Sequence, residues 1–355
     1  MKKIAVFTGS DLRNYGGGEK DVINWTSHLK EQLDITIYTV RDKNEQSHRI
    51  AMEEIEKQLN GVKIIFYKGR KIRLLKDILT FQRFDLSRYD KVYSMCQGFL
   101  LNGKLQKTAN RFLLGIHTQS TLMDEPIEAH KAWKRFFFRF YRKRQIKVVM
   151  KSDEIRIQNS DDMKRLHQIG YKGKIWNVPP AMFDNTPEPV DAGKFYVVWV
   201  NRVSPEKRPE ELVKVASLMP EVEFHAIGSG RSSQVFDGIP NIKKLGFLSN
   251  EELQKEYQGA SAYLSTSRGE NFGMSAMEAM AHGVVTVSYD VMGLRDFCKV
   301  IVFDASEARI HLNLLKLQYE RSPNNYLMYR RDIRDQTISK YSNKVILPLV
   351  LEMMR

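Results

Sequence analysis

The stretch PPAMFDNTPEPVDAGKFYVVWV, residues 179–200, divides the chain into two halves. Its first sixteen residues contain four prolines and have neither helical nor strand periodicity, so they are typical of a linker. The strand-like run that follows begins a second series of strands and helices. We therefore expect one domain at residues 1–180, a linker at 181–194 and a second domain at 195–340. We expect a helix at 341–355 to return to the first domain.

Short runs of β-branched and aromatic residues alternate with longer helical stretches, as in a parallel sheet with crossover helices. In the first half the strand-like runs are Ile4–Thr8, Ile35–Val40, Val62–Lys68, Lys91–Met95, Arg111–His117 and Glu154–Asn159. In the second half they are Phe195–Asn201, Val222–Ile227, Ile242–Phe247, Ala262–Thr266, Val284–Ser288 and Val300–Phe303. Helices are expected at Glu19–Gln32, Glu210–Met219, Asn250–Gln258 and Gly273–His282. The sequence thus predicts one α/β architecture that occurs twice.

The composition is that of a globular protein. The chain has 355 residues, of which 42% are hydrophobic and 28% are charged, and this argues against a disordered or fibrous protein. Its two cysteines give no support to a disulfide framework. No apolar run approaches the length of a membrane span, and the apolar run near the N-terminus is too short for a signal peptide. We therefore expect a cytoplasmic protein.

The positive charge lies in the first half of the chain. Residues 1–180 contain 35 Lys and Arg against 20 Asp and Glu, whereas residues 181–355 contain 21 against 22. An excess of positive charge that is confined to one domain indicates that this domain binds an anionic partner. A nucleic acid is one such partner, but no nucleic-acid motif is present, so we regard nucleic-acid binding as an alternative only.

The segment KAWKRFFFRFYRKRQIKVVMK, residues 131–151, holds nine Lys and Arg residues, no acid and several aromatics. On a helix this pattern is typical of a segment that adsorbs to an anionic membrane surface. The residues we expect at such a surface, or at the acceptor, are Lys134, Arg135, Phe137, Arg139, Arg142 and Lys143. The alternative is a helix packed on the core, with its basic face in solvent. We expect a cytoplasmic protein that can attach peripherally to the inner face of a membrane.

Three further stretches contain residues suited to binding an anion or a sugar. In TGSDLRNYGGGEKDV, three glycines, Gly16, Gly17 and Gly18, precede a helix, where backbone N–H groups can hold a phosphate. The GxGxxG spacing of dinucleotide sites is absent. A surface loop is the alternative reading of the three glycines.

The stretch WVNRVSPEKRPEELV, residues 199–213, places Arg202 and Lys207 after a strand and before a helix. Open α/β sheets bind ligands at this edge, and two fixed cations there could neutralise a diphosphate without a metal. A solvated turn is the alternative.

The stretch STSRGENFGMSAMEAMAHG, residues 265–283, carries Glu270 in a loop and Glu278 inside an Ala-rich helix. A carboxylate in such surroundings needs a partner, and sugar hydroxyls are suitable donors to it. A helix cap or a helix–helix ion pair would also satisfy it.

The stretch GENFGMSAMEAMAHG, with seven residues between Glu270 and Glu278, resembles the signature of the retaining glycosyltransferases of family 4, which have the GT-B fold. NRVSPEKRPEELV resembles the phosphate-binding segment of that family, and IGSG at Ile227–Gly230 resembles its glycine turn. The resemblance covers residues 195–290 best. It implies two Rossmann-like domains that face each other across a cleft, with the donor bound mostly by the second domain and the acceptor mostly by the first.

The resemblance implies a role for each matching residue. Arg202 and Lys207 would hold the donor diphosphate, Glu278 the ribose hydroxyls and Glu270 the transferred sugar. His117, in LLGIHTQS, matches a family histidine near the reaction centre. The implied catalytic set is Glu270, His117, Arg202 and Lys207. The other implied donor-binding residues are Gly16, Gly17, Gly18, Gly228, Gly230, Phe247, Leu248, Asn271, Phe272, Gly273, Met274 and Ser275.

The implied reaction moves a sugar from a UDP-, GDP- or ADP-sugar to an acceptor hydroxyl, with retention of the anomeric configuration. The acceptor could be a lipid-linked or cell-surface glycan precursor, a lipid or a small molecule. No cluster of His, Cys, Asp or Glu has metal-ligand spacing, so we expect neither a metal nor another cofactor. The alternatives are a GT-B sugar-nucleotide epimerase and a non-catalytic protein that binds a sugar nucleotide, a nucleic acid or a membrane.

Overall fold

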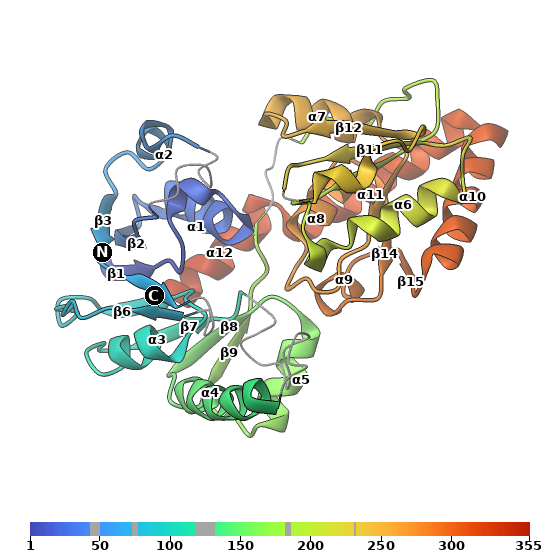
Figure 1. Ribbon diagram of the computed structural model, residues 1–355. Helices are drawn as coiled ribbons and strands as arrows, with labels where there is room; N and C mark the ends of the chain where they lie inside the picture. The colour runs from blue at the N-terminus through green and yellow to red at the C-terminus, as the bar shows by residue number, and fades with distance from the viewer. Residues whose placement is uncertain (43–49, 73–76, 118–131, 182–185, 231) are drawn as a thin grey trace. The chain divides into compact units, whose positions relative to one another are not determined.

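A computed structural model of the chain describes residues 1–42, 50–72, 77–117, 132–181, 186–230 and 232–355, without the side chains of 132–138 (Figure 1). The chain divides into two compact units. Unit 1 comprises Met1–Ala181 and Lys344–Arg355, and unit 2 comprises Met182–Asn343. The division falls within the proline-rich stretch at 179–194.

Unit 1 is built on a seven-stranded parallel sheet with the order β3-β2-β1-β6-β7-β8-β9. The strands of unit 1 are β1 (Lys2–Phe7), β2 (Leu33–Val40), β3 (Lys63–Tyr67), β4 (Arg70–Ile72), β5 (Asp77–Leu79), β6 (Lys91–Ser94), β7 (Phe112–Gly115), β8 (Glu154–Ile157) and β9 (Lys174–Asn177). The helices are α1 (Gly17–Leu29), α2 (Met52–Gln58), α3 (Phe99–Leu105), α4 (Ala132–Met150), α5 (Ser160–Gln168) and α12 (Asn343–Met354). Strands β4 and β5 form a separate antiparallel pair.

Both faces of the unit 1 sheet are covered, because its strands are apolar on both sides. In β1, Ile4 and Val6 join a core with α1, α2 and α12, whereas Ala5 and Phe7 join a second core with α3, α4 and α5. Helix α12 brings Ile346, Val350, Met353 and Met354 into the first of these cores. The C-terminal helix is therefore a structural part of unit 1.

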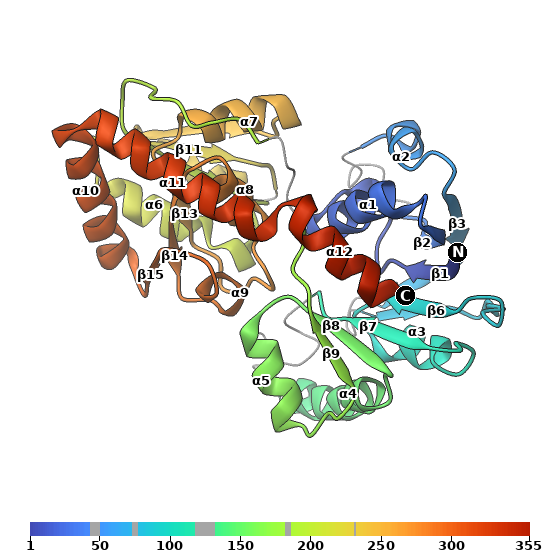
Figure 2. The same cartoon turned by 180° about the vertical axis from the view of Figure 1, so that it is seen from behind.

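Unit 2 is built on a six-stranded parallel sheet with the order β12-β11-β10-β13-β14-β15. Its strands are β10 (Tyr196–Val200), β11 (Glu223–Ile227), β12 (Ile242–Gly246), β13 (Ala262–Ser265), β14 (Val285–Tyr289) and β15 (Val300–Val302). Its helices are α6 (Pro209–Ser217), α7 (Asn250–Gly259), α8 (Met274–Ala281), α9 (Met292–Arg295), α10 (Ala305–Arg321) and α11 (Pro323–Tyr341). Helix α11 runs alongside α8 (Figure 2).

Each of the twelve predicted strand runs contains a strand, and the predicted α/β class is confirmed. The sequence reading missed β9 at the edge of the unit 1 sheet and the short β4–β5 pair. It also assigned no helices to 305–341, where α10 and α11 form. Helix α1 begins at Gly17, earlier than predicted, so Gly17 and Gly18 belong to its first turn and are not part of a loop.

A buried arginine on α11 fastens the last part of unit 2. The Arg330 side chain is 3% exposed and donates to the carbonyl oxygens of Gly283 (3.1 Å), Val190 (2.9 Å) and Gln258 (2.7 Å). Burial lowers the pKa of Arg330 to about 10, so the guanidinium stays charged at neutral pH. One side chain thus ties α11 to three segments that are distant in sequence.

We predict that Arg330→Met destabilises unit 2 by about 3 kcal/mol, because several buried carbonyl groups lose their donors together. The adjacent Arg331 provides a matched control, since it is half exposed and lies 3.4 Å from Glu188 in a surface ion pair. Arg331→Met should cost less than about 0.5 kcal/mol. Urea unfolding followed by circular dichroism measures both values, and equal stability of the two variants would contradict the role given to Arg330.

Candidate functional site

Two loops meet at the carboxyl edge of the unit 2 sheet. Strands β10 and β13 are neighbours, although β11 and β12 lie between them in the chain, so the connections after them diverge to opposite sides. Such a switch point is where open α/β sheets bind ligands. The segment after β10 carries Arg202 and Lys207, and the loop after β13 carries Glu270. The topology therefore brings two of the predicted motifs to one place.

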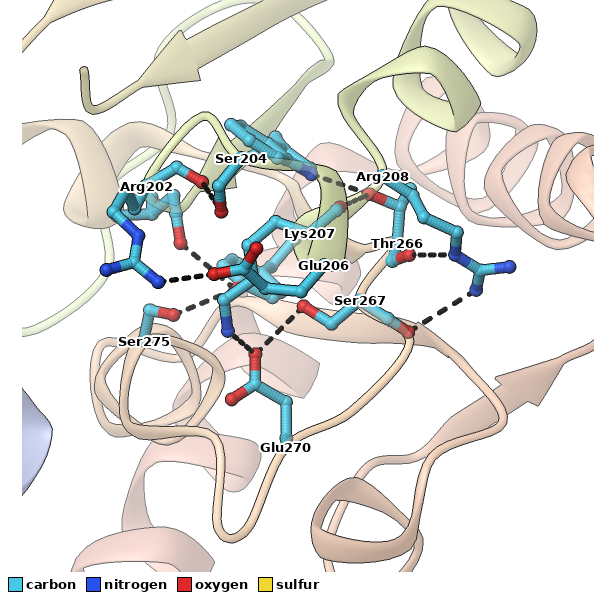
Figure 3. Close-up of polar contacts among 12 residues, drawn as sticks. Arg202, Ser204, Glu206, Lys207, Arg208, Thr266, Ser267, Glu270 and Ser275 are labelled. Carbon is cyan, nitrogen blue, oxygen red and sulfur yellow. Dashed lines mark hydrogen bonds and ion pairs between the residues drawn. The ribbon is translucent and has the colours of Figure 1, made fainter. Parts of the chain in front are cut away.

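Lys207 and Glu270 form an ion pair across this switch point (Figure 3). The Lys207 Nζ donates to Glu270 Oε1, which also accepts from the Ser267 hydroxyl at 2.8 Å. The two ionised side chains are 17% and 16% exposed. Each therefore compensates much of the desolvation of the other, while both stay accessible from solvent.

Arg202 takes a different partner. Its guanidinium bonds the carboxylate of Glu206, and both side chains are at least half exposed. Burial works to raise the pKa of Glu206, but its backbone amide and the Arg202 charge outweigh it and hold the pKa below its usual value. An exposed pair of this kind contributes little stability, so Arg202 can exchange Glu206 for another anion at small cost. Sequence analysis did not identify Glu206.

Arg208 holds the two loops together, and sequence analysis also missed it. Its guanidinium donates to the carbonyls of Thr266 (2.7 Å) and Ser267 (3.3 Å) and lies 4.7 Å from the centre of the Tyr289 ring. The Thr266 hydroxyl in turn donates to the Lys207 carbonyl at 2.7 Å. The backbone of Arg208 is left-handed, with φ 46°, which is uncommon for a residue other than glycine. This clamp fixes the backbones from which Lys207 and Glu270 project.

Helix α8 begins beside this ion pair. Gly273 precedes it at φ 93°, and a Cβ there would lie 2.1 Å from Leu294 Cδ2, so the sharp entry needs glycine. Phe272 is buried against Phe297 and Tyr341, whereas Asn271, Met274 and Ser275 are half-buried. The N-terminus of α8, with its outward N–H groups, is therefore adjacent to Glu270 and favours an anion.

Glu278 lies on α8 and is half-buried. Burial raises the pKa of the Tyr263 hydroxyl, its bond to Ser275 opposes this, and the carboxylates of Glu270 and Glu278 both add to the rise. One buried hydroxyl thus lies within electrostatic range of both acids.

The glycine turn after β11 lies against the segment after β10. A Cβ on Gly228 would lie 2.0 Å from the Asn201 carbonyl oxygen, and one on Gly230 would lie 2.1 Å from that of Val203. Next to this turn, after β12, the Phe247 ring is 58% exposed and Leu248 is half-buried. The edge of unit 2 therefore offers close-packed backbone and one exposed aromatic face near the predicted cations.

Unit 1 holds the remaining predicted residues. Gly16 caps α1, and a Cβ on Gly18 would lie 2.6 Å from Met95 Cε. His117 follows β7, and its Nε2 lies 2.5 Å from the Tyr93 hydroxyl. Burial, with a smaller contribution from the Arg156 charge, lowers the pKa of His117 to about 3, so the imidazole is neutral at physiological pH.

Part of the basic segment lies on α4. Arg139 and Lys143 are exposed, Phe140 is half exposed, and Arg142 is partly buried. The side chains of Lys134, Arg135 and Phe137 lie outside the described residues. The described helices contain none that is both long and apolar enough to cross a membrane. Among the residues that the structure describes, no group of three His, Cys, Asp or Glu side chains is arranged to hold a metal ion.

Residues 183–300 match the family model of the glycosyl transferases group 1. A peptide N-acetylglucosaminyltransferase GtfA subunit of Streptococcus pneumoniae is 28% identical over 130 residues, which cover 34% of this chain and 26% of the relative. The sulfoquinovosyl transferase SQD2 of Arabidopsis thaliana is 30% identical over 104 residues, covering 28% of this chain and 20% of SQD2. The chain thus spans about a quarter of the length of these curated relatives.

Solved structures match nearly the whole chain at low identity. Sucrose-phosphate synthase of Thermosynechococcus elongatus has a TM-score of 0.75 at 15% identity and covers 99% of this chain and 98% of its own. HepE of Anabaena, in complex with UDP-glucose, has a TM-score of 0.74 at 12% identity, and the match covers 100% of this chain and 99% of HepE. Taken together, these likenesses show that residues 183–300 are similar to the glycosyl transferases group 1 and that the chain has the GT-B fold.

Proposed function

We propose that this protein is a retaining glycosyltransferase that moves a sugar from a nucleoside diphosphate to an acceptor hydroxyl. The observation that carries the proposal is the Lys207–Glu270 pair at the switch point of unit 2, beside the N-terminus of α8. A cation, a carboxylate and a helix N-terminus at one accessible edge suit the two parts of such a donor. The diphosphate needs positive charge, and the sugar hydroxyls need an acceptor.

In this proposal Lys207 turns from Glu270 to the diphosphate, and Arg202 turns from Glu206 to the same group. Glu270 then accepts hydrogen bonds from the sugar, and Glu278 accepts them from the ribose. The turn at Gly228 and Gly230 and the exposed Phe247 ring border the base. The GT-B relative HepE is in complex with UDP-glucose, which favours UDP as the nucleotide of the donor.

The reaction in this proposal breaks the bond between C1 of the sugar and the diphosphate oxygen while the acceptor oxygen bonds C1 from the same face. The acceptor proton passes to the departing diphosphate. The growing negative charge of the leaving group is the main obstacle, and the side chains of Lys207 and Arg202 and the α8 amides supply fixed positive charge for it. We propose that these groups do so without a metal, so EDTA should leave turnover unchanged.

A screen of UDP-, GDP- and ADP-sugars by thermal shift identifies the donor, because a ligand that binds only the folded protein stabilises it. Consumption of that donor with and without acceptors then separates a transferase from an epimerase, which converts the sugar without an acceptor. The anomeric configuration of the product tests retention.

We predict that Lys207→Ala lowers turnover by roughly 10²–10³-fold, because the leaving group loses a fixed cation. Glu270→Gln should also reduce turnover, since a neutral amide is a weaker acceptor for sugar hydroxyls. Release of UDP from UDP-glucose or UDP-N-acetylglucosamine, with and without added acceptors, measures both effects.

Lys244→Ala is the matched control for these variants, because Lys244 forms an ion pair with Asp237 on the surface of the same unit. This control should turn over like the wild type. Near-normal turnover of Lys207→Ala, in a protein that melts like the wild type, would reject the proposed site.

We also propose that the acceptor lies at an anionic membrane surface to which α4 attaches. Arg139, Lys143 and Lys147 are exposed on α4, and the half-exposed Phe140 ring lies 5.1 Å from the Arg144 guanidinium carbon. Exposed cations beside an exposed aromatic ring are suited to a headgroup layer, where each cation contributes about 1 kcal/mol.

We predict that the protein floats with vesicles of phosphatidylglycerol and phosphatidylcholine, and that high salt releases it. Removing two cations with Lys143→Gln and Lys147→Gln should weaken binding about 30-fold, at about 1 kcal/mol for each. Lys63→Gln with Lys172→Gln is the control, because these lysines are exposed elsewhere on unit 1. Failure to bind the vesicles at low salt would defeat the membrane proposal and leave the transferase proposal intact.

A further inference from the structure

Unit 1 contains an ion pair that is sealed from solvent. Arg156 of β8 and Asp21 of α1 are both buried, with Arg156 Nη1 at 2.7 Å and Nη2 at 3.3 Å from the two carboxylate oxygens. The guanidinium also donates to the carbonyls of Val178 (2.9 Å) and Pro179 (3.2 Å). With its charge balanced and its N–H groups bonded, Arg156 is held in one position.

The next member of this network is Tyr93 of β6. Arg156 Nη1 lies 3.2 Å from the Tyr93 hydroxyl oxygen, and that oxygen lies 2.5 Å from His117 Nε2. A guanidinium can only donate, so the phenol oxygen accepts from Arg156. Among the described residues, His117 is the remaining partner of this hydroxyl. Donation of the phenol proton to Nε2 satisfies both groups, whereas a protonated Nε2 would leave the phenol proton without an acceptor. An imidazole nitrogen that accepts a hydrogen bond carries no proton.

The sequence makes room for this contact at Gly115 of β7. A Cβ on Gly115 would lie 2.7 Å from both His117 Nε2 and the Tyr93 hydroxyl oxygen. With any other residue at this position, the His117 ring or the Tyr93 hydroxyl would therefore have to shift. The absence of a side chain at Gly115 is an independent observation that the Tyr93–His117 bond is built into the strand.

We propose that Tyr93, held by the Asp21–Arg156 pair, is a positioning residue that fixes His117 as the neutral tautomer protonated at Nδ1. The ring then offers an N–H donor, and not a cation, at the carboxyl end of β7. That the Nδ1–H of His117 donates to a substrate oxygen rests on the proposed glycosyltransferase function. The assignment of the tautomer does not rest on it.

The pKa directions agree with this arrangement. Burial raises the pKa of Tyr93 to about 12, so the phenol keeps the proton that it donates. Burial and the Arg156 charge lower the pKa of His117, as a second positive charge beside the guanidinium would be unfavourable.

Nitrogen NMR of histidine-labelled, ligand-free protein tests the proposal, with the His117 signals assigned by their loss in His117→Asn. We expect a protonated Nδ1 and an unprotonated Nε2, with no titration between about pH 5 and 8. Tyr93→Phe keeps the ring and removes the donor, so the His117 signals should move toward a mixture of the two tautomers. Gly115→Ala should cause the same change by wedging the two groups apart.

Tyr171→Phe is the matched control, because the buried Tyr171 hydroxyl donates to the Ser152 carbonyl at 2.9 Å and does not contact His117. It should leave the His117 signals unchanged. A protonated Nε2 or an imidazolium in the wild type would overturn the proposal, and so would Tyr93→Phe signals identical to those of the wild type.

Turnover separates this inference from the proposed function. If the protein transfers sugar, Tyr93→Phe should lower kcat by about tenfold with little change in KM for the donor, because one hydrogen-bond donor is less well oriented. A wild-type protein without any transfer activity would refute the proposed function, while the NMR result would still decide the tautomer.

Discussion

The candidate site depends on how the chain leaves two neighbouring strands, β10 and β13. Because these strands meet at the switch point, the segment that carries Lys207 and the loop that carries Glu270 start side by side. Arg208 then binds the loop through two carbonyls, and Thr266 returns a bond to the Lys207 carbonyl. These hydrogen bonds between the two loops hold Lys207 and Glu270 in contact, although the two residues lie 63 positions apart in the chain.

Much of this arrangement could be predicted from local sequence signals. The apolar strands of both sheets have a clear β-branched and aromatic character, and Gly, Pro or a charge follows many of them closely. Since the carboxyl ends of parallel strands share one edge, the cations of 202–207 and the acid at 270 could be expected at that edge. The same reasoning failed for β9, whose strand side chains are only partly buried or exposed.

Other parts could not be predicted, because their partners are distant in the chain. In the sequence, Arg208 is one more basic residue in a charged turn. Only its left-handed backbone and its bonds to the Thr266 and Ser267 carbonyls show that it holds the two loops together. Asp21 and Arg156 are 135 positions apart, and each alone looks like an ordinary surface charge. No periodicity or motif in a single sequence indicates which charged residues will be buried together.

The two ion pairs differ in a way that bears on their roles. Arg156 and Asp21 are sealed in unit 1, and carbonyls take the remaining N–H groups, so exchanging either partner for a ligand would leave a buried charge uncompensated. Such a pair suits a fixed support. Lys207 and Glu270 are each about one-sixth exposed, so an arriving ligand can replace one partner by another of the same charge. On the proposed function, the diphosphate takes the place of Glu270 at Lys207, and sugar hydroxyls take the place of Lys207 at Glu270. The pair then keeps both groups oriented until the donor binds.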